Sequence, residues 1–137
     1  MGMGYQPAGL FRRTDAERAD QMLSWQRGDQ AFFAAGACHI LAWAFVETHP
    51  GYRVYGLLPR GETDFEHIIA SNGRWAFDHC GWTPTAELLQ AYDAEMVLIE
   101  TDLETFCTAN NHRRPEQYAF SPWQRARDYI ARHAQVA

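Results

Sequence analysis

Residues 67–78 read His-Ile-Ile-Ala-Ser-Asn-Gly-Arg-Trp-Ala-Phe-Asp and predict a β-hairpin. Short runs rich in β-prone side chains, residues 66–70 and 74–78, lie on either side of Asn72-Gly73. Asn-Gly is the strongest short-range hairpin signal, because a type I′ turn needs positive φ at both of its central residues. We therefore expect two antiparallel strands joined by a two-residue turn.

That turn also predicts which residues lie opposite each other. With residues 72 and 73 as the turn, His67 pairs with Asp78, and both lie on one face of the hairpin. The other face carries the apolar side chains of Ile68, Ala70, Trp75 and Phe77. An imidazole and a carboxylate then come within hydrogen-bonding reach, although a slip of one residue would separate them onto opposite faces.

Sequence signals before the hairpin predict two helices and a strand. Residues 1–13 suggest a loose arm, and the capping box Thr14-Asp15-Ala16-Glu17 opens a helix that runs to about Arg27. Gly36 interrupts an apolar run, and Cys38 to about Thr48 then forms a helix that is apolar nearly all round and so buried. His49-Pro50-Gly51 ends that helix, and residues 53–58 alternate as a strand does.

After the hairpin the signals are less regular. Thr83 as N-cap and Pro84 at the first helical position predict a helix through about Tyr92. Residues 96–100 are compatible with a strand or a helical turn, and residues 110–114 read as a loop. Ser121-Pro122-Trp123-Gln124 is a second capping box, which predicts a terminal helix to about His133.

Length and composition favour one compact domain. The 137 residues are 47% hydrophobic and 14% aromatic, enough for a real core and too apolar for a disordered chain. We expect a single α+β domain, residues 1–137, in which the buried helix packs on a small antiparallel sheet. There is no signal-peptide pattern and no apolar run of membrane-spanning length, so the expected location is the cytoplasm, or a host cell reached without a cleavable signal.

The charged residues are unusual in kind. All 12 basic residues are arginine, and the net charge of -5 argues against general nucleic-acid binding. The absence of lysine has two explanations: the codon usage of a GC-rich genome, or avoidance of amines that the protein's own chemistry or a host modification would attack. Five arginines near the C-terminus form a basic face suited either to solvent or to an acidic partner: Arg113, Arg114, Arg125, Arg127 and Arg132.

Cys38, His67 and Asp78 are the candidate catalytic residues. Cys38 is expected at the N-terminus of a buried helix, where unpaired amides and the helix dipole favour a thiolate. His67 can act as the base beside that sulfur, and Asp78 can orient the imidazole and stabilise its charged form. For the oxyanion of such a reaction, Gln30 is a candidate beside the backbone amide of Cys38.

These residues resemble the papain-like superfamily. Gly36-Ala37-Cys38 opens an apolar helix, His67 stands on a strand and Asp78 follows the hairpin, an order similar to that of the transglutaminase-like and arylamine N-acetyltransferase branches. The resemblance covers about residues 30–82. It implies an α+β fold with a papain-like core and acyl transfer through a thioester on Cys38.

The sequence thus predicts a cysteine-dependent acyl-transfer enzyme, either an amide or peptide hydrolase, a deamidase or a transglutaminase-like enzyme. Its expected substrate is a protein or peptide-like amide, and no cofactor is expected. The alternative is a non-catalytic effector, immunity or adaptor module in which Cys38 is a small core residue and His67–Asp78 a structural pair. A zinc site formed by Cys38-His39 and His79-Cys80 is disfavoured, because adjacent residues on a helix or a strand point in different directions.

Overall fold

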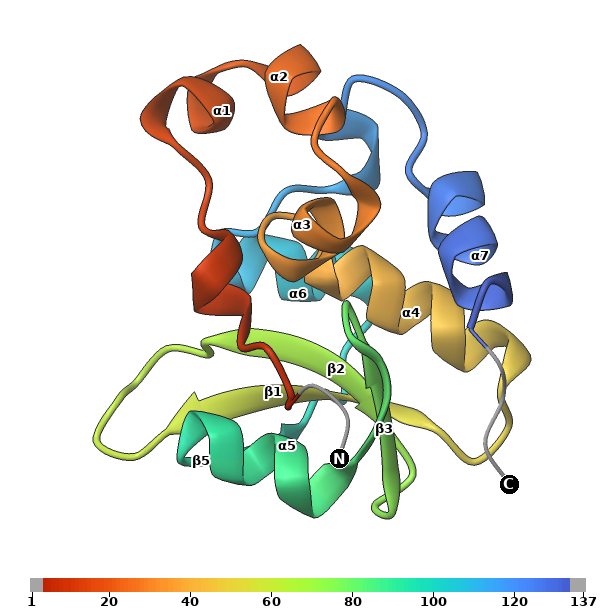
Figure 1. Cartoon of the computed structure of the whole chain (residues 1–137). Coiled ribbons are helices and arrows are strands. Elements are labelled where there is room, and N and C mark those ends of the chain that lie inside the picture. The colour runs from red at the N-terminus through yellow and green to blue at the C-terminus, as the bar shows by residue number, and fades with distance from the viewer. Residues whose placement is uncertain (1–3, 134–137) are drawn as a thin grey trace.

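The structure is a computed structural model, and it describes residues 4–133 of the chain (Figure 1). The α-helices are α1 (Asp15–Ala19), α2 (Gln21–Trp25), α3 (Asp29–Ala34), α4 (Cys38–Thr48), α5 (Thr85–Tyr92), α6 (Leu103–Asn110) and α7 (Trp123–Ala131). Two short 3₁₀ helices are η1 (Ala8–Phe11) and η2 (Pro115–Gln117). The strands are β1 (Arg53–Pro59), β2 (His67–Ser71), β3 (Trp75–Asp78), β4 (Gly81–Pro84) and β5 (Ala94–Leu98).

The five strands form one antiparallel sheet in the order β4-β3-β2-β1-β5. Helix α4 packs on one face of the sheet, chiefly on β2, and α7 packs on α4. Helix α5 lies on the other face (Figure 1). This arrangement confirms the predicted α+β fold with a buried helix on a small antiparallel sheet, and it adds a second helical layer that the sequence did not predict.

Two apolar clusters hold these layers together. Between α4 and the sheet the cluster includes Phe45, Ile68 and Phe77, all with exposed fractions of 1% or less. On the opposite face a second cluster includes Ile69 of β2 and Leu88 of α5. Because both faces of β2 are covered, all five of its residues are buried, the polar His67 and Ser71 included.

The register of the hairpin differs from the prediction by two residues. Ala70 pairs with Phe77 and Ser71 with Ala76, so the loop is centred on residues 73 and 74 rather than 72 and 73. The cause is Asn72, whose side chain accepts hydrogen bonds from the backbone N–H groups two and three residues later, while only Gly73 has positive φ. A two-residue shift preserves the face of every side chain, so His67 and Asp78 remain on the same face as predicted.

Helix prediction succeeded where the signals were local and strong. Helix α4 has the expected bounds, and the Thr14 capping box forms. The predicted helix to Arg27 is nevertheless wrong, because Asp20 caps a new helix through the N–H groups of Met22 and Leu23. A further short helix, α3, then begins at Asp29.

Several boundaries in the second half also differ. Thr83 and Pro84 end strand β4, and helix α5 begins only at Thr85, because β4 pairs with β3 up to Pro84. Of the two options for residues 96–100, the structure has a strand, β5. Helix α6 was not predicted, and α7 forms without the expected Ser121 cap.

The expected loose arm is instead packed against the sheet. Residues 4–13 include helix η1, and Ala8 is buried. The Tyr5 hydroxyl lies 2.9 Å from that of Tyr92 on α5, and the Ala8 N–H donates to the Tyr92 hydroxyl at 2.8 Å. These hydrogen bonds fix the arm beside His67 and Asp78. The first three residues of the predicted arm lie outside the described residues.

Candidate active site

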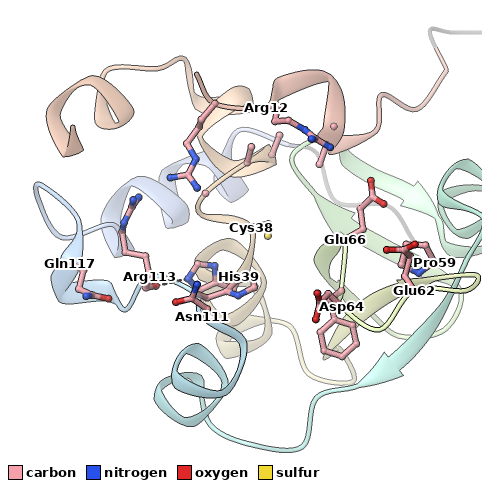
Figure 2. Close-up of a pocket in the computed structure, with 18 of the residues that line it drawn as sticks. Arg12, Cys38, His39, Pro59, Glu62, Asp64, Glu66, Asn111, Arg113 and Gln117 are labelled. Atoms are coloured by element: carbon pink, nitrogen blue, oxygen red, sulfur yellow. Dashed lines mark hydrogen bonds between the residues drawn. The ribbon is translucent and has the colours of Figure 1, made fainter. Parts of the chain in front are cut away.

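Cys38 is the first residue of α4 and lines a cavity of about 760 Å³ (Figure 2). The chain reaches it through a sharp turn in which Gly36 has a φ of 117°, and the Tyr118 hydroxyl donates to the Gly36 carbonyl at 2.5 Å. Ala37, the N-cap residue, has no side-chain oxygen to cap the helix. The first N–H groups of α4 therefore have no side-chain partner from the cap position.

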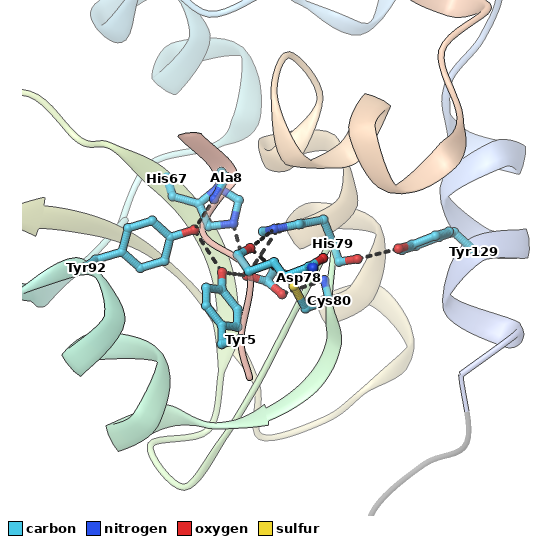
Figure 3. A network of polar contacts seen from close by, with 9 residues as sticks. Tyr5, Ala8, His67, Asp78, His79, Cys80, Tyr92 and Tyr129 are labelled. Atoms are coloured by element: carbon cyan, nitrogen blue, oxygen red, sulfur yellow. Dashed lines mark hydrogen bonds and ion pairs between the residues drawn. The ribbon is translucent and has the colours of Figure 1, made fainter. Parts of the chain in front are cut away.

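His67 and Asp78 form the hydrogen bond that the hairpin predicts. His67 Nε2 lies 3.1 Å from Asp78 Oδ2, and both side chains are buried (Figure 3). Because this bond occupies Nε2, His67 Nδ1 remains as the second nitrogen, and it has no hydrogen-bond partner among the described residues. It is the atom available to a neighbouring thiol.

The carboxylate of Asp78 receives hydrogen bonds from several directions. Asp78 Oδ2 accepts from the Tyr5 hydroxyl and lies 3.4 Å from His79 Nδ1, and Oδ1 accepts from the Cys80 N–H at 2.9 Å (Figure 3). Burial alone would raise the pKa of Asp78, but the hydrogen bond from His67 and the charges of the two histidines lower it. Asp78 is thus held ionised in a buried position.

The thiol and the two nearest imidazoles shift one another's protonation. Burial alone would raise the pKa of Cys38, but the neighbouring imidazoles of His39 and His67 hold it well below its usual value. Burial would lower the pKa of His67, yet Asp78 and Cys38 raise it to about 9. Both directions favour a thiolate beside an imidazolium.

His39 is a second imidazole next to the sulfur. Its Nε2 lies 2.7 Å from the carbonyl oxygen of Arg113, and it is 1% exposed. Burial lowers its pKa, but the thiols of Cys107 and Cys38 and the Arg113 carbonyl raise it to about 9. Sequence reasoning considered it only as a ligand of the disfavoured zinc site, because Cys107 and Arg113 lie more than 60 residues away in the chain.

Two other sequence predictions for the site, the oxyanion residue Gln30 and the zinc alternative, do not fit the structure. Gln30 is exposed on α3 and does not line the cavity, so the structure gives it no place at an oxyanion. The zinc alternative is not supported, because Cys38, His39, His79 and Cys80 do not form a close set of ligand atoms within residues 4–133.

A different trio could approach a single metal ion. Within residues 4–133, His67, Asp78 and His79 are all buried and have ligand atoms within 4.8 Å of one another. The ligand atoms of both histidines already face Asp78 Oδ2, and His79 Nε2 lies 2.7 Å from the Gln6 carbonyl. Asp78 thus joins the two histidines, His67 through a hydrogen bond and His79 through an ion-pair contact, and holds the His67 ring in place.

The arginines of the predicted basic face have separate environments. Arg125 and Arg132 both bind Asp29, and Arg125 also donates to the carbonyl oxygens of Trp25 and Arg27. Three others have partners or positions elsewhere: Arg114 pairs with Glu116, Arg127 donates to Gln124, and Arg113 lines the Cys38 cavity.

No family model, curated protein or solved structure matches this chain. Among the helices of residues 4–133, none combines the length and the apolar character needed to cross a membrane.

Proposed function

We propose that the protein is a cysteine-dependent acyl-transfer enzyme, with Cys38 as nucleophile, His67 as general base and acid, and Asp78 as the residue that orients His67. The observation that carries the proposal is the position of His67. Its Nε2 is bound to a buried carboxylate, and its Nδ1 is unpartnered next to a thiol whose pKa is lowered. A papain-like, transglutaminase-like reaction is the chemistry that this arrangement suits.

In the first half-reaction the Cys38 thiolate attacks the carbonyl carbon of an amide or thioester. A C–S bond forms, and the carbonyl π electrons move to the oxygen as an oxyanion. The oxyanion collapses, the bond to the leaving amine or thiol breaks, and His67 donates its proton to that group. The product is a thioester on Cys38 and a neutral imidazole.

In the second half-reaction water or an amine attacks the thioester carbonyl. His67 takes the proton of the attacking group, the C–S bond breaks, and the Cys38 thiolate and the imidazolium are restored. Water gives hydrolysis, and an amine gives acyl transfer. Asp78 remains ionised throughout, which stabilises each imidazolium state.

The helix start provides the oxyanion donors in this proposal. The N–H groups at the beginning of α4 point out of the helix end, and Ala37 offers them no side-chain acceptor. Such amides stabilise a developing oxyanion with little reorganisation. They take the role that sequence reasoning gave to Gln30.

The three cysteines supply an internal test by alkylation with iodoacetamide, followed by peptide mass spectrometry. We expect Cys38 to react at about pH 6, where an ordinary thiol with a pKa of about 8.5 is almost unreactive. Cys80 is the control within the same molecule, because burial and the nearby Asp78 charge raise its pKa to about 12. Equal labelling of the two at every pH, or labelling of Cys38 only above pH 8.5, would count against the proposal.

A further inference from the structure

The cavity in front of Cys38 is electrically asymmetric. Figure 2 shows Arg113 on one side of Cys38, and on the other side the acidic residues Glu62, Asp64 and Glu66. Arg13 also lines the cavity. None of the ion pairs among the described residues includes Arg13 or Arg113. Three guanidinium groups thus line the cavity without a carboxylate partner among the described residues, because Arg12 lines it as well and is likewise in no ion pair.

Of the three, only Arg13 has a buried nitrogen without a hydrogen-bond partner among the described residues. Its Nη1 is a buried donor, and it has no hydrogen-bond partner within residues 4–133. The guanidinium also lies next to Gly36, where an added Cβ would be 3.4 Å from its Cζ, and Gly36 is two residues before the nucleophile. Native proteins rarely leave a buried charged donor unpaired, so this atom points to an acceptor that arrives with a ligand.

Arg113 is held in place rather than free to turn away. In the amide orientation that satisfies both side chains, Gln21 accepts from Arg113 Nη2 at 2.9 Å and from Nε at 3.1 Å. The Arg113 guanidinium lies over the Tyr118 ring, 5.2 Å from its centroid, and the Tyr118 hydroxyl donates a hydrogen bond to the Gly36 carbonyl. Burial and the Arg113 charge both lower the pKa of Arg13, so an anion between the two would relieve a like-charge contact.

We propose that Arg13 and Arg113 form an anion subsite, and that the substrate is an acyl compound with a carboxylate or phosphate group close to the scissile carbonyl. Guanidinium groups bind these anions through paired, charge-assisted hydrogen bonds. The acidic side of the cavity repels the same group, so the substrate enters in one orientation. The inference rests on the proposed function, since it describes the substrate of the Cys38 reaction.

Two alkylating reagents of nearly equal size test the subsite. In both, the Cys38 thiolate displaces iodide, so that a C–S bond forms as the C–I bond breaks; iodoacetate carries a carboxylate where iodoacetamide carries a neutral amide. Because both reagents react with the same thiolate, the ratio of their rate constants does not depend on the fraction of Cys38 that is ionised. In the Arg13→Gln/Arg113→Gln variant we expect the iodoacetate-to-iodoacetamide ratio to fall about tenfold, as for loss of a charge-assisted hydrogen bond. The matched control Arg53→Gln removes an exposed arginine that does not line the cavity, and should leave the ratio unchanged.

Protection by inorganic phosphate is a second test of the anion subsite, and it uses the wild-type protein. Phosphate should slow the reaction of Cys38 with iodoacetamide more than chloride does at equal ionic strength. A ratio that is the same in the wild type and the double variant, or phosphate that protects no better than chloride, would overturn the subsite. Rapid iodoacetamide labelling at about pH 6 would in that case leave the proposed function intact, whereas slow labelling refutes that function itself.

Discussion

Replacement of Asp78 by asparagine removes one negative charge from the buried network and keeps the size of the side chain. Asp78 is the direct partner of His67 Nε2, at 3.1 Å, and it is 2% exposed. The amide can still accept one hydrogen bond, but it no longer stabilises the imidazolium by charge. We therefore expect a change in the thiolate–imidazolium pair and not only in stability.

The structure gives the size of this change. His67 has a pKa of about 9 against 6.5 for an unperturbed imidazole, and the difference corresponds to about 3 kcal/mol of stabilisation of the charged form. Asp78 shares that stabilisation with Cys38, and a hydrogen bond to a charged group is worth about 1.5–3 kcal/mol. Asp78→Asn should thus lower the pKa of His67, and raise the pKa of Cys38, by about one to two units.

The assay is the rate of iodoacetamide labelling of Cys38 as a function of pH, with thermal denaturation to show that each protein is folded. The inflection should move upward in Asp78→Asn and stay in place in Asp15→Asn, an exposed aspartate on α1 that pairs only with Arg18. An unchanged inflection in a folded Asp78→Asn protein would refute the coupling of Asp78 to Cys38 through His67. A loss of stability alone would instead fit the non-catalytic alternative.

Three further changes test other parts of the structure. His39→Gln should cost more stability at pH 6.5 than at pH 9. The pKa of His39 is raised from 6.5 to about 9 in the folded protein, so its contribution to stability is complete below pH 6.5 and is lost as the pH rises through 9. Equal losses in urea denaturation at both pH values would contradict this. Tyr5→Phe should lower the free energy of unfolding by about 1 kcal/mol, since it removes the hydroxyl contacts to Asp78 and Tyr92, and an unchanged urea midpoint would show that these contacts do not stabilise the fold. Gly56→Ala should destabilise by about 1–3 kcal/mol, because the new Cβ would lie 2.6 Å from the Phe65 ring; a wild-type melting temperature would rule out that close packing.

The parts of the fold that the sequence predicts correctly depend on local patterns. Helix α4 begins at Cys38, as expected from the break at Gly36 and the apolar run behind it. The predicted hairpin register was wrong, yet His67 and Asp78 still form a hydrogen bond, because a shift of two residues leaves each side chain on the same face of the sheet. The alternation of side chains along the strands thus predicted the His67–Asp78 pair correctly, whereas the assumed turn type predicted the wrong register.

The remaining site residues are brought in by tertiary contacts that leave no local signal. Tyr5 belongs to a segment that looked like a loose arm, and it reaches Asp78 across 73 residues of sequence. Sequence reasoning treated His79 and Cys80 as adjacent strand residues, but β3 ends at Asp78, and the following turn brings the His79 ring to the Asp78 carboxylate. The proximity of Arg13 to Gly36 likewise depends on how residues 4–13 pack.

The most direct test of the central claim is intact-mass analysis after reaction with an activated ester, 4-nitrophenyl acetate. The chain has no lysine, so no side-chain amine competes for the acetyl group. We predict one acetyl group on Cys38 that is lost again as the thioester hydrolyses, and none in Cys38→Ala. An equal adduct in Cys38→Ala, or acetylation of Cys80 or Cys107 in place of Cys38, would contradict the account.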